Sequence, residues 1–541
     1  MSDAVRRTAL TLGAALAVVP ATQAATFTVS NLDDSGPGSL RQAVLDANGA
    51  AGADVIQFDA GLTGAIVLSS GQLAVTDSVD VQGPGAADLA VTGLGDSRLF
   101  YLYSGQALID VTISGLTLAG GNANVGGAIA DLGENLVLDS VVVVGNVASV
   151  DVEGGGDGGG IWAADTKGGS LSLTIRDSSI SGNTAGHDGG GIHLDNTGGP
   201  VLIESTTING NDAANDGGGL SLFILRDDMT VLNSTISGNT AGADGGGLFL
   251  NGLYGYLSIL ETTVADNSAG GFGGGLFTLA GTIQVRNSIA GDNSPNDLGN
   301  GLGSASFEAA YSLVENKDVS TVFDNGGNIF GQDPQLGPLA DNGGPTRTHL
   351  PAPASPVINA GDPAFAPPPS TDQRGLPRIV NGRLDMGSVE VEMPAAAGTI
   401  QLAVSAASVG ETAGTITITA TRTGGSSGAV SVTVNTADGT AVAPADYGAV
   451  IGAVLNWADG DTAPKTLNIS IVADGVTEPA ETFDVILSNP TGGAALGAPA
   501  NEIVTIVDAA NVVDVPTASD FGLAVLTAIL SLAGIYLVRR Q

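Results

Sequence analysis

The sequence predicts an all-β protein: a right-handed parallel β-helix, then an antiparallel Ig-like β-sandwich, then a C-terminal transmembrane helix. Three observations lead to this prediction. A glycine-rich pattern recurs about every 28 residues in the middle of the chain, and such a period marks stacked units. Strand-like segments without that period follow in residues 397–508, and an uncharged apolar run lies near the end.

Residues 1–24 are predicted to be a secretory signal peptide. Arg6 and Arg7 precede an apolar run that ends at Val19, and small residues around Ala24 offer a cleavage site. The apolar run is too short to span the ~30 Å hydrocarbon core of a membrane. We therefore expect the chain to be exported.

Residues 25–393 are predicted to form the β-helix, with a capping α-helix over residues 39–48. Ser39 is a suitable N-cap and Gly49 a suitable end. Between them lies an apolar stripe of Leu40, Ala43, Val44 and Ala47. Because the open end of a β-helix presents unpaired strand edges, we expect the α-helix to cover that end.

The central repeat consists of similar units. The block Asp-Gly-Gly-Gly-Ile/Leu starts at residues 157, 188, 216 and 244, and a fifth copy has Phe272 in place of the aspartate. Alternating segments rich in β-branched residues follow each copy, which is typical of strands with one buried face. No unit has room for a helix, so equivalent strands are expected to pair in parallel, one turn above the next.

Two polar residues recur in these units. One is an asparagine in a predicted turn: Asn183, Asn211, Asn239 and Asn267. We expect its amide to bond to the asparagines above and below. The other is the aspartate of each block: Asp157, Asp188, Asp216 and Asp244. These carboxylates either gather a cation or only start a glycine corner in contact with solvent, and the loss of the aspartate at Phe272 favours the second interpretation.

The paired blocks Gly-Gly-x-Ile/Leu and Ile-x-x-Asn give the central third of the chain a family resemblance. They resemble the repeats of chlamydial polymorphic outer-membrane proteins and related bacterial surface β-helices. The resemblance implies display on a cell surface, but it identifies no ligand.

A second resemblance covers residues 333–390. Its segments include Asp333-Pro334-Gln335-Leu336-Gly337-Pro338-Leu339, Ser355-Pro356-Val357-Ile358-Asn359-Ala360-Gly361 and Asp385-Met386-Gly387-Ser388-Val389-Glu390. They resemble the choice-of-anchor Q domain, which is often found just before bacterial surface anchors. We expect this part to be the C-terminal cap of the β-helix, where Pro and Gly end the ladder of strands.

Residues 397–508 carry alternating segments separated by polar turns, which predict an antiparallel β-sandwich. The motifs are Val409-Gly410-Glu411, Ala445-Asp446-Tyr447, Trp457-Ala458-Asp459-Gly460-Asp461 and Asp474-Gly475-Val476-Thr477-Glu478-Pro479-Ala480-Glu481-Thr482-Phe483. They are similar to those of the Calx-β domain, the calcium-regulatory module of sodium–calcium exchangers.

That resemblance implies a calcium site between loops at one tip of the sandwich. Six acids fall on the ligand positions of the family: Glu411, Asp446, Asp474, Glu478, Glu481 and Asp508. Ca²⁺ prefers six to eight oxygen ligands, so this chemistry is suitable. Ala473 stands where a further aspartate is usual, and alanines follow Asp508. We therefore expect Ca²⁺ as the cofactor, one ion or at most two, with a dissociation constant of roughly 10⁻⁴–10⁻³ M. The alternative is a set of solvated acidic loops.

Residues 509–541 are predicted to be a sorting tail with a transmembrane helix over residues 521–538. This run has no charged residue and is followed by Arg539-Arg540. The segment Val515-Pro516-Thr517-Ala518-Ser519-Asp520-Phe521-Gly522 resembles the Ile-Pro-Thr-Leu-Ser-Glu-Trp-Gly (IPTL-type) sorting tails of some Gram-negative bacteria, although Ala518 departs from that pattern. The resemblance implies export across the inner membrane, sorting and processing machinery as a partner, and a location in the membrane, at the cell surface or outside the cell. Whether the tail is cleaved stays open.

Composition limits the function. The formal net charge of −38 argues against binding of nucleic acid, and the absence of cysteine excludes disulfides and thiolate metal sites. We predict that the chain is not an enzyme, because the eye-catching pair Asp227-Asp228 falls in a turn and only three lysines exist to assist a lyase.

The sequence therefore favours a surface-anchored structural or adhesive protein with a calcium-binding domain, and a surface polysaccharide or another cell as candidate partners. The alternative is a β-helix that binds or cleaves polysaccharide. An aromatic-lined groove would favour that alternative, but 13 Phe, 7 Tyr and 2 Trp leave little material for one.

Overall fold

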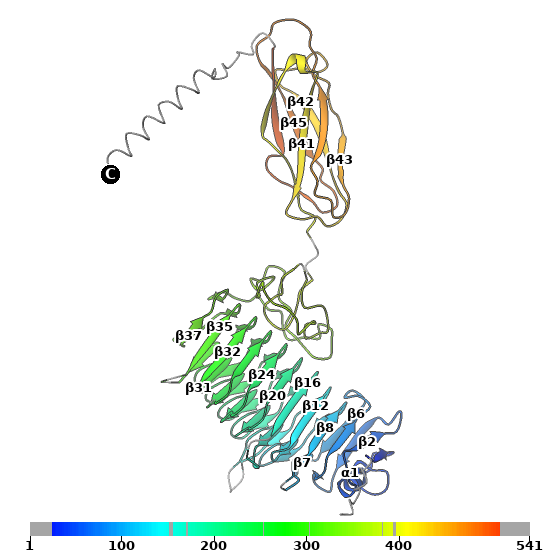
Figure 1. The fold of residues 1–541 in the computed structure, drawn as a ribbon, viewed down its shortest axis with the longest axis vertical. Coiled ribbons are helices and arrows are strands. Elements are labelled where there is room, and N and C mark those ends of the chain that lie inside the picture. Colours follow the sequence, from blue (N-terminus) through cyan, green and yellow to red (C-terminus); the bar gives the residue numbers. More distant parts are fainter. Residues whose placement is uncertain are drawn as a thin grey trace, which may run out of the picture. The chain divides into compact units, whose positions relative to one another are not determined.

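The computed structural model describes residues 24–508 except 106, 151–154, 169–170, 253, 302, 304, 381 and 393–395. The chain divides into two compact units, Met1–Glu392 and Met393–Gln541 (Figure 1). The predicted signal peptide, apart from Ala24, and the predicted tail with its transmembrane helix over 521–538 lie outside the described residues. In the part that is described, no helix has the length and apolar character needed to cross a bilayer.

The first unit is a parallel β-solenoid built from four sheets, each of which runs from turn to turn. Sheet A contains β1 (Thr26–Val29), β2 (Asp54–Phe58), β5 (Val79–Gln82), β8 (Asp110–Ser114), β12 (Asn135–Asp139), β16 (Ser172–Arg176), β20 (Val201–Glu204), β24 (Met229–Leu232), β28 (Leu257–Leu260), β32 (Thr282–Arg286), β35 (Ser306–Ala310) and β37 (Val322–Asp324). Sheet B contains β3 (Gly64–Leu68), β6 (Leu89–Gly93), β9 (Thr117–Ala119), β13 (Val142–Val144), β17 (Ser179–Ser181), β21 (Thr207–Asn209), β25 (Thr235–Ser237), β29 (Thr263–Ala265), β33 (Ile289–Gly291), β36 (Leu313–Val314) and β38 (Ile329–Phe330).

Two further sheets complete each turn. Sheet C contains β4 (Leu73–Val75), β7 (Phe100–Leu102), β11 (Ile129–Asp131), β15 (Ile161–Ala164), β19 (Ile192–Asp195), β23 (Leu220–Phe223), β27 (Leu248–Asn251), β31 (Leu276–Ala280) and β34 (Leu298–Asn300). Sheet D contains β10 (Asn122–Ala123), β14 (Val147–Ala148), β18 (Thr184–Ala185), β22 (Asp212–Ala213), β26 (Thr240–Ala241) and β30 (Ser268–Ala269).

Equivalent residues of successive copies lie one over another. In sheet C, Ile192, Leu220, Leu248 and Leu276 are successive parallel partners, all fully buried. The parallel solenoid predicted from the repeat is therefore confirmed. Its core consists of such aliphatic columns, because alternation along each strand sends every second side chain inward.

The asparagine column is also present and is longer than the repeat suggested. Asn146, Asn183, Asn211, Asn239, Asn267 and Asn293 are stacked, and each Nδ2 donates to Oδ1 of the next at 2.8–3.0 Å. The backbone N–H of each of the first five donates to the same Oδ1 atom, at 2.9–3.0 Å. At the end of the ladder, Nδ2 of Asn293 donates to Oδ1 of Asp297 at 2.8 Å. The ladder satisfies polar groups inside the solenoid that water does not reach.

The helix expected over 39–48 is present as α1 (Leu40–Gly49), which lies against β1, β2 and β4 of the first turns. The side chain of Ser39 accepts from the backbone N–H of Gln42, and the predicted apolar stripe is buried. Arg41 joins the helix to the solenoid, because its guanidinium donates to the backbone oxygens of Gly71 and Gln72.

Residues 333–390 lie elsewhere than predicted. This segment, here called the strap, was expected to cap the end of the ladder, but it runs along the outer side of sheet B. Thr207, Thr235 and Thr263, in β21, β25 and β29, bond to Arg347, Gln373 and Ser388 of the strap, at 2.6–3.0 Å. The threonines point away from the solenoid core yet are buried, because the strap covers them. The strap thus ties successive turns together from outside.

The second unit is a sandwich of two sheets. Sheet E contains β39 (Thr399–Leu402), β41 (Thr415–Thr423), β44 (Lys465–Ser470) and β46 (Ala495–Leu496). Sheet F contains β40 (Ala406–Gly410), β42 (Val430–Asp438), β43 (Ala453–Trp457), β45 (Glu481–Ser488) and β47 (Asn501–Val507). A 3-10 helix, η1 (Glu411–Ala413), follows β40.

The prediction of an antiparallel sandwich is wrong for two strand pairs. β39 pairs with β46, and β40 with β47, in parallel. Alternating hydrophobicity reports which side chains are buried but not the direction of a strand, so the sequence pattern could not reveal this. The core between the sheets holds Trp457, Tyr447 and Phe483, and the last two rings stack with centroids 4.1 Å apart.

Candidate metal centre

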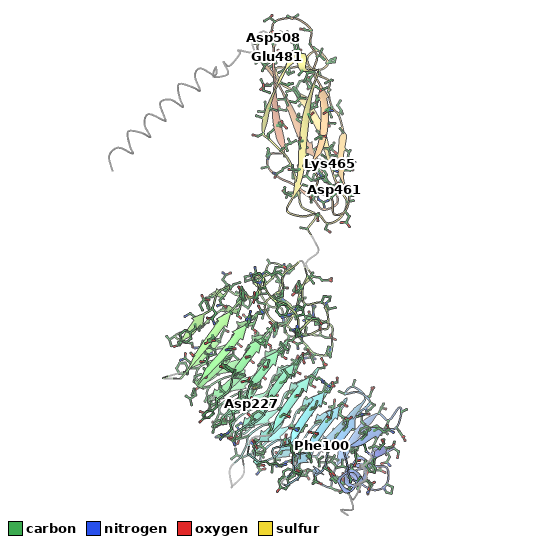
Figure 2. All side chains as sticks on the ribbon, viewed as in Figure 1. Phe100, Asp227, Asp461, Lys465, Glu481 and Asp508 are labelled. Atoms are coloured by element: carbon green, nitrogen blue, oxygen red, sulfur yellow. The ribbon has the colours of Figure 1, made fainter. Side chains whose placement is uncertain are left out.

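One tip of the second unit gathers acidic side chains from four chain segments. Glu411 opens η1, Asp446 lies between β42 and β43, Glu481 opens β45, and Asp508 directly follows β47. Figure 2 shows Glu481 and Asp508 at this tip, with Asp461 and Lys465 toward the opposite end of the unit. Each of these acids starts or directly follows a strand or η1, or lies in a loop between two strands, so the fold brings them to the same tip.

The acids surround a small hollow of about 20 Å³, which has room for about one ion or water molecule. Its lining is Glu411, Asp446, Glu478, Glu481 and Asp508, with Val472, Pro479 and Ile506. Carboxylate oxygens of Asp446, Glu478 and Glu481 lie within 4.8 Å of one another. Two oxygens on opposite sides of one Ca²⁺ ion are about 4.6–5.2 Å apart, since Ca–O distances are about 2.3–2.6 Å. The spacing therefore fits oxygens that share one calcium ion.

Backbone N–H groups hold several of these carboxylates in position. Asp474 N donates to Oε1 of Glu411 at 2.9 Å, and Glu478 N donates to Oδ2 of Asp508 at 3.0 Å. Val442 N donates to Oδ2 of Asp446 at 2.7 Å. A carboxylate has four lone-pair sites, so a bond from one backbone N–H does not by itself prevent a carboxylate from binding a cation.

The cluster raises the pKa of its central glutamates. Loss of solvent raises the pKa of Glu478, and the charges of Asp474 and Asp446 raise it further. Loss of solvent likewise raises the pKa of Glu481, together with the charge of Asp446. Like charges gathered in one place disfavour ionisation, and a bound cation would reverse that effect.

The structure brings all six predicted acids to this tip. Five of them line the hollow, while Asp474 is exposed at its edge and acts on the cluster through its charge and its backbone N–H. The hollow has room for about one ion. The expectation of one ion or at most two stays a prediction.

The aspartates of the repeat have a structural role that the sequence did not show. Oδ1 of Asp157, Asp188, Asp216 and Asp244 accepts the backbone N–H one turn further on, at 2.7–3.1 Å. The fourth of these donors is Phe272 N. Asp244 therefore accepts a bond from the next turn even though that turn has Phe272 in place of an aspartate. The favoured interpretation, an aspartate that only starts a corner, is therefore incomplete.

The acid pair Asp227-Asp228 and one of the three lysines have partners within the solenoid. Asp227 and Asp228 lie in the turn between β23 and β24, as predicted, and Oδ1 of Asp227 accepts the N–H of Asp228. Lys167 is bonded to the buried Glu134. A cluster that the sequence analysis missed contains Asp157, His187 and Asp188. In the sequence, the only sign of this cluster is that His187 directly precedes Asp188. The stacking of two turns is what brings Asp157 next to these two residues.

Comparison with known proteins supports the interpretation of this tip. Residues 394–510 match the model of the Calx-beta domain. The second unit thus contains a Calx-beta domain, and that resemblance is confirmed. No match was found among curated proteins. The resemblances of the repeat, the strap and the tail stay predictions.

Three solved structures are similar to this part of the chain. The apo form of the Calx CBD1 domain has 29% identity, with 20% of this chain and 97% of that chain covered and a TM-score of 0.19. CBD12 from CALX1.2 has 30% identity, with 20% and 45% covered and a TM-score of 0.20. The calcium binding domain CBD12 of CALX1.1 has 29% identity, with 20% and 44% covered and a TM-score of 0.19.

Proposed function

We propose that the chain is an exported, surface-anchored structural or adhesive protein whose Calx-beta domain binds Ca²⁺ through Glu411, Asp446, Asp474, Glu478, Glu481 and Asp508. The observation that carries the calcium assignment is the ion-sized hollow lined by carboxylates from separate loops. The family match of residues 394–510 supports the same chemistry. A cation held there would join the loops and oppose the mutual repulsion of the acids.

Titration calorimetry of the full chain with Ca²⁺ tests this assignment. We expect one site with a dissociation constant of roughly 10⁻⁴–10⁻³ M. Glu481→Gln should weaken binding by about tenfold or more, because it removes a charged ligand while keeping the shape of the side chain. Asp461→Asn is the matched control, since it changes an acid of the same domain toward the opposite end (Figure 2) and should leave the affinity unchanged. Absence of heat at millimolar Ca²⁺, or equal affinity of the two variants, would refute the site.

Surface anchoring is part of the same proposal and is supported by the sequence of the two ends. Fractionation of cells that express a tagged copy tests it. We expect the tag in the membrane fraction, at the cell surface or in the medium, and a chain that lacks residues 509–541 should lose membrane association. Recovery of the intact chain in the cytosol would refute export.

One observation favours the alternative, a solenoid that binds polysaccharide. Phe223, Phe249 and Phe277 form a column of rings along sheet C, with successive centroids 6.2 and 5.6 Å apart. The column ends at a hollow of about 690 Å³, where Phe272 and Val319 are exposed. Phe249 and Phe277 are only 3% and 4% exposed, so the aromatic surface that a polysaccharide could contact here is mainly that of Phe272 at the hollow. Retarded migration in gels that contain uronate or neutral polymers would support this function, and unsaturated products would add cleavage to it.

A further inference from the structure

The corner between the first two copies of the repeat brings together a histidine and two carboxylates. Nδ1 of His187 lies 3.0 Å from Oδ1 of Asp157 and 3.2 Å from Oδ2 of Asp188. All three ligand atoms lie within 4.8 Å of one another. Asp157 belongs to the preceding turn, so the group exists only because the two turns are stacked in this register.

The carboxylates are held by the backbone and are not free to turn away. Oδ1 of Asp157 accepts the N–H of Asp188 at 3.1 Å, and Oδ1 of Asp188 accepts the N–H of Asp216 at 3.0 Å. Oδ2 of Asp188 is thereby directed to the histidine. Only 4% of the Asp188 side chain is exposed, whereas 51% of the His187 side chain is exposed, so the cluster has a rigid inner part and an open outer side.

The spacing fits a small transition-metal ion. Zn²⁺ binds nitrogen at about 2.0–2.1 Å and carboxylate oxygen at about 2.0–2.2 Å, so tetrahedral ligand atoms are about 3.4 Å apart. The two measured distances, 3.0 and 3.2 Å, need to open by only a few tenths of an ångström. Ca²⁺ fits less well, because it requires six to eight oxygens and one of these three ligands is nitrogen.

A second, separate observation marks the same corner. His193 on β19 is 5% exposed, and its Nδ1 has no hydrogen-bond partner among the described residues. A Cβ placed on Gly189, next to Asp188, would lie 2.8 Å from Cβ of His193, so the side chain packs directly against this corner. Burial lowers the pKa of His193, and the charge of Asp157 opposes that effect. The residue packed against this corner thus carries a buried nitrogen without a partner, and such an atom calls for a water or an ion as its partner.

We propose that Asp157, His187 and Asp188 form a binding site for a divalent transition-metal ion such as Zn²⁺, with water completing its coordination. The site is independent of the calcium site, because it lies in the other unit of the chain. One imidazole and two carboxylates bring a charge of −2 to the ion and neutralise it. An ion here would join one turn of the solenoid to the next at the only described corner where a histidine precedes the aspartate of the block.

Trp162 offers a local probe of this site. It pairs with His193 across sheet C, and a Cβ on Gly158, next to Asp157, would lie 2.8 Å from Cβ of Trp162. The chain has two tryptophans, so the variant Trp457→Phe leaves Trp162 as the single indole. An ion with an open d shell, such as Co²⁺, quenches a nearby indole and therefore reports its own binding.

The experiment is a Co²⁺ titration of full-length Trp457→Phe protein, with saturating Ca²⁺ to occupy the acids of the other unit, followed by competition with Zn²⁺. We expect saturable quenching with one ion bound, and recovery of fluorescence as Zn²⁺ displaces Co²⁺. His187→Gln and Asp157→Asn, each added to this background, should weaken the affinity at least tenfold. His187 is half exposed and Asp157→Asn keeps the Oδ1 acceptor, so both variants should fold.

Asp244→Asn is the matched control, because it changes the same position of the block where no histidine is present, and its affinity should equal that of the parent. Two results would overturn the proposal. One is no saturable quenching at millimolar Co²⁺, which would leave a simple histidine–aspartate ion pair. The other is an equal affinity in the His187→Gln variant. Neither result would affect the calcium assignment, which is measured separately.

Discussion

Removal of one rung of the asparagine ladder should cost the solenoid a large share of its stability. Asn239 is fully buried and its side chain takes part in four hydrogen bonds. Nδ2 donates to Asn267 Oδ1 at 2.8 Å and to Ile208 O at 3.0 Å, and Oδ1 accepts from Asn211 N and Nδ2 at 3.0 and 2.9 Å. A typical intramolecular hydrogen bond contributes about 1 kcal/mol net, and a buried donor left without a partner costs about 1–3 kcal/mol. We therefore expect Asn239→Ala to lower the free energy of unfolding by about 3–6 kcal/mol.

A second substitution at the same position separates hydrogen bonding from packing. Asn239→Asp keeps the volume and the acceptor for Asn211, but at neutral pH it loses both donors and places a buried charge against Asn267 Oδ1. Protonation at low pH restores one donor, so its deficit should shrink as the pH falls. The deficit of Asn239→Ala should not change with pH, because alanine does not titrate.

The measurement is urea unfolding of the full chain in the Trp457→Phe background, with Trp162 as the reporter of the solenoid. Asn122→Ala is the control, since Asn122 belongs to the same solenoid but its bonds to Gly95 O and Ser149 Oγ are exposed. This control should cost less than about 1 kcal/mol. A loss below about 1 kcal/mol for Asn239→Ala, or an Asn239→Asp deficit that is constant with pH, would refute the reasoning.

Two further predictions concern the acidic tip and the strap. In the calcium-free protein, the raised pKa values of Glu478 and Glu481 mean that the folded state binds protons more readily than the unfolded state, so the Calx-beta domain should gain stability as the pH falls from 7 toward 5. The added stabilisation by Ca²⁺ should shrink over the same range, because protons displace the ion. Thermal unfolding followed by Trp457 in a Trp162→Phe background checks both signs, and a calcium effect that grows on acidification would contradict them. Gln373→Ala removes buried bonds to Thr207, Thr235 and Thr346 at 2.6–2.9 Å and should cost about 2–4 kcal/mol, with faster proteolysis inside residues 333–390; unchanged proteolysis would show that Gln373 does not hold the strap.

Sequence reasoning identified the features that recur at fixed spacing. The asparagine ladder and the aliphatic columns follow from a period near 28 residues, because stacking places equivalent side chains one over another. The six acids of the tip were found in a different way, through motifs that resemble a known domain. Their order along the chain does not itself show that Glu411 and Asp508 meet.

Features that depend on contact between distant, non-periodic segments were missed. The strap lacks alternation, and Thr207, Thr235 and Thr263 look like ordinary strand threonines that face solvent. Nothing local shows that another segment buries them. The metal-ligand group around His187 depends on a register of 31 residues between Asp157 and Asp188, whereas the later blocks are spaced by 28. Such contacts are set by tertiary structure and leave no periodic trace.

The stacked turns also limit what the solenoid is suited for. Each turn of about 28 residues lengthens the coil by only ~4.8 Å, whereas the same residues in an α-helix would span ~42 Å. The solenoid therefore gains little length per residue. Each added turn instead enlarges its lateral surface, on which equivalent side chains recur every few ångströms. Gain or loss of a copy would alter how many weak contacts an extended ligand makes at once far more than how far the protein reaches.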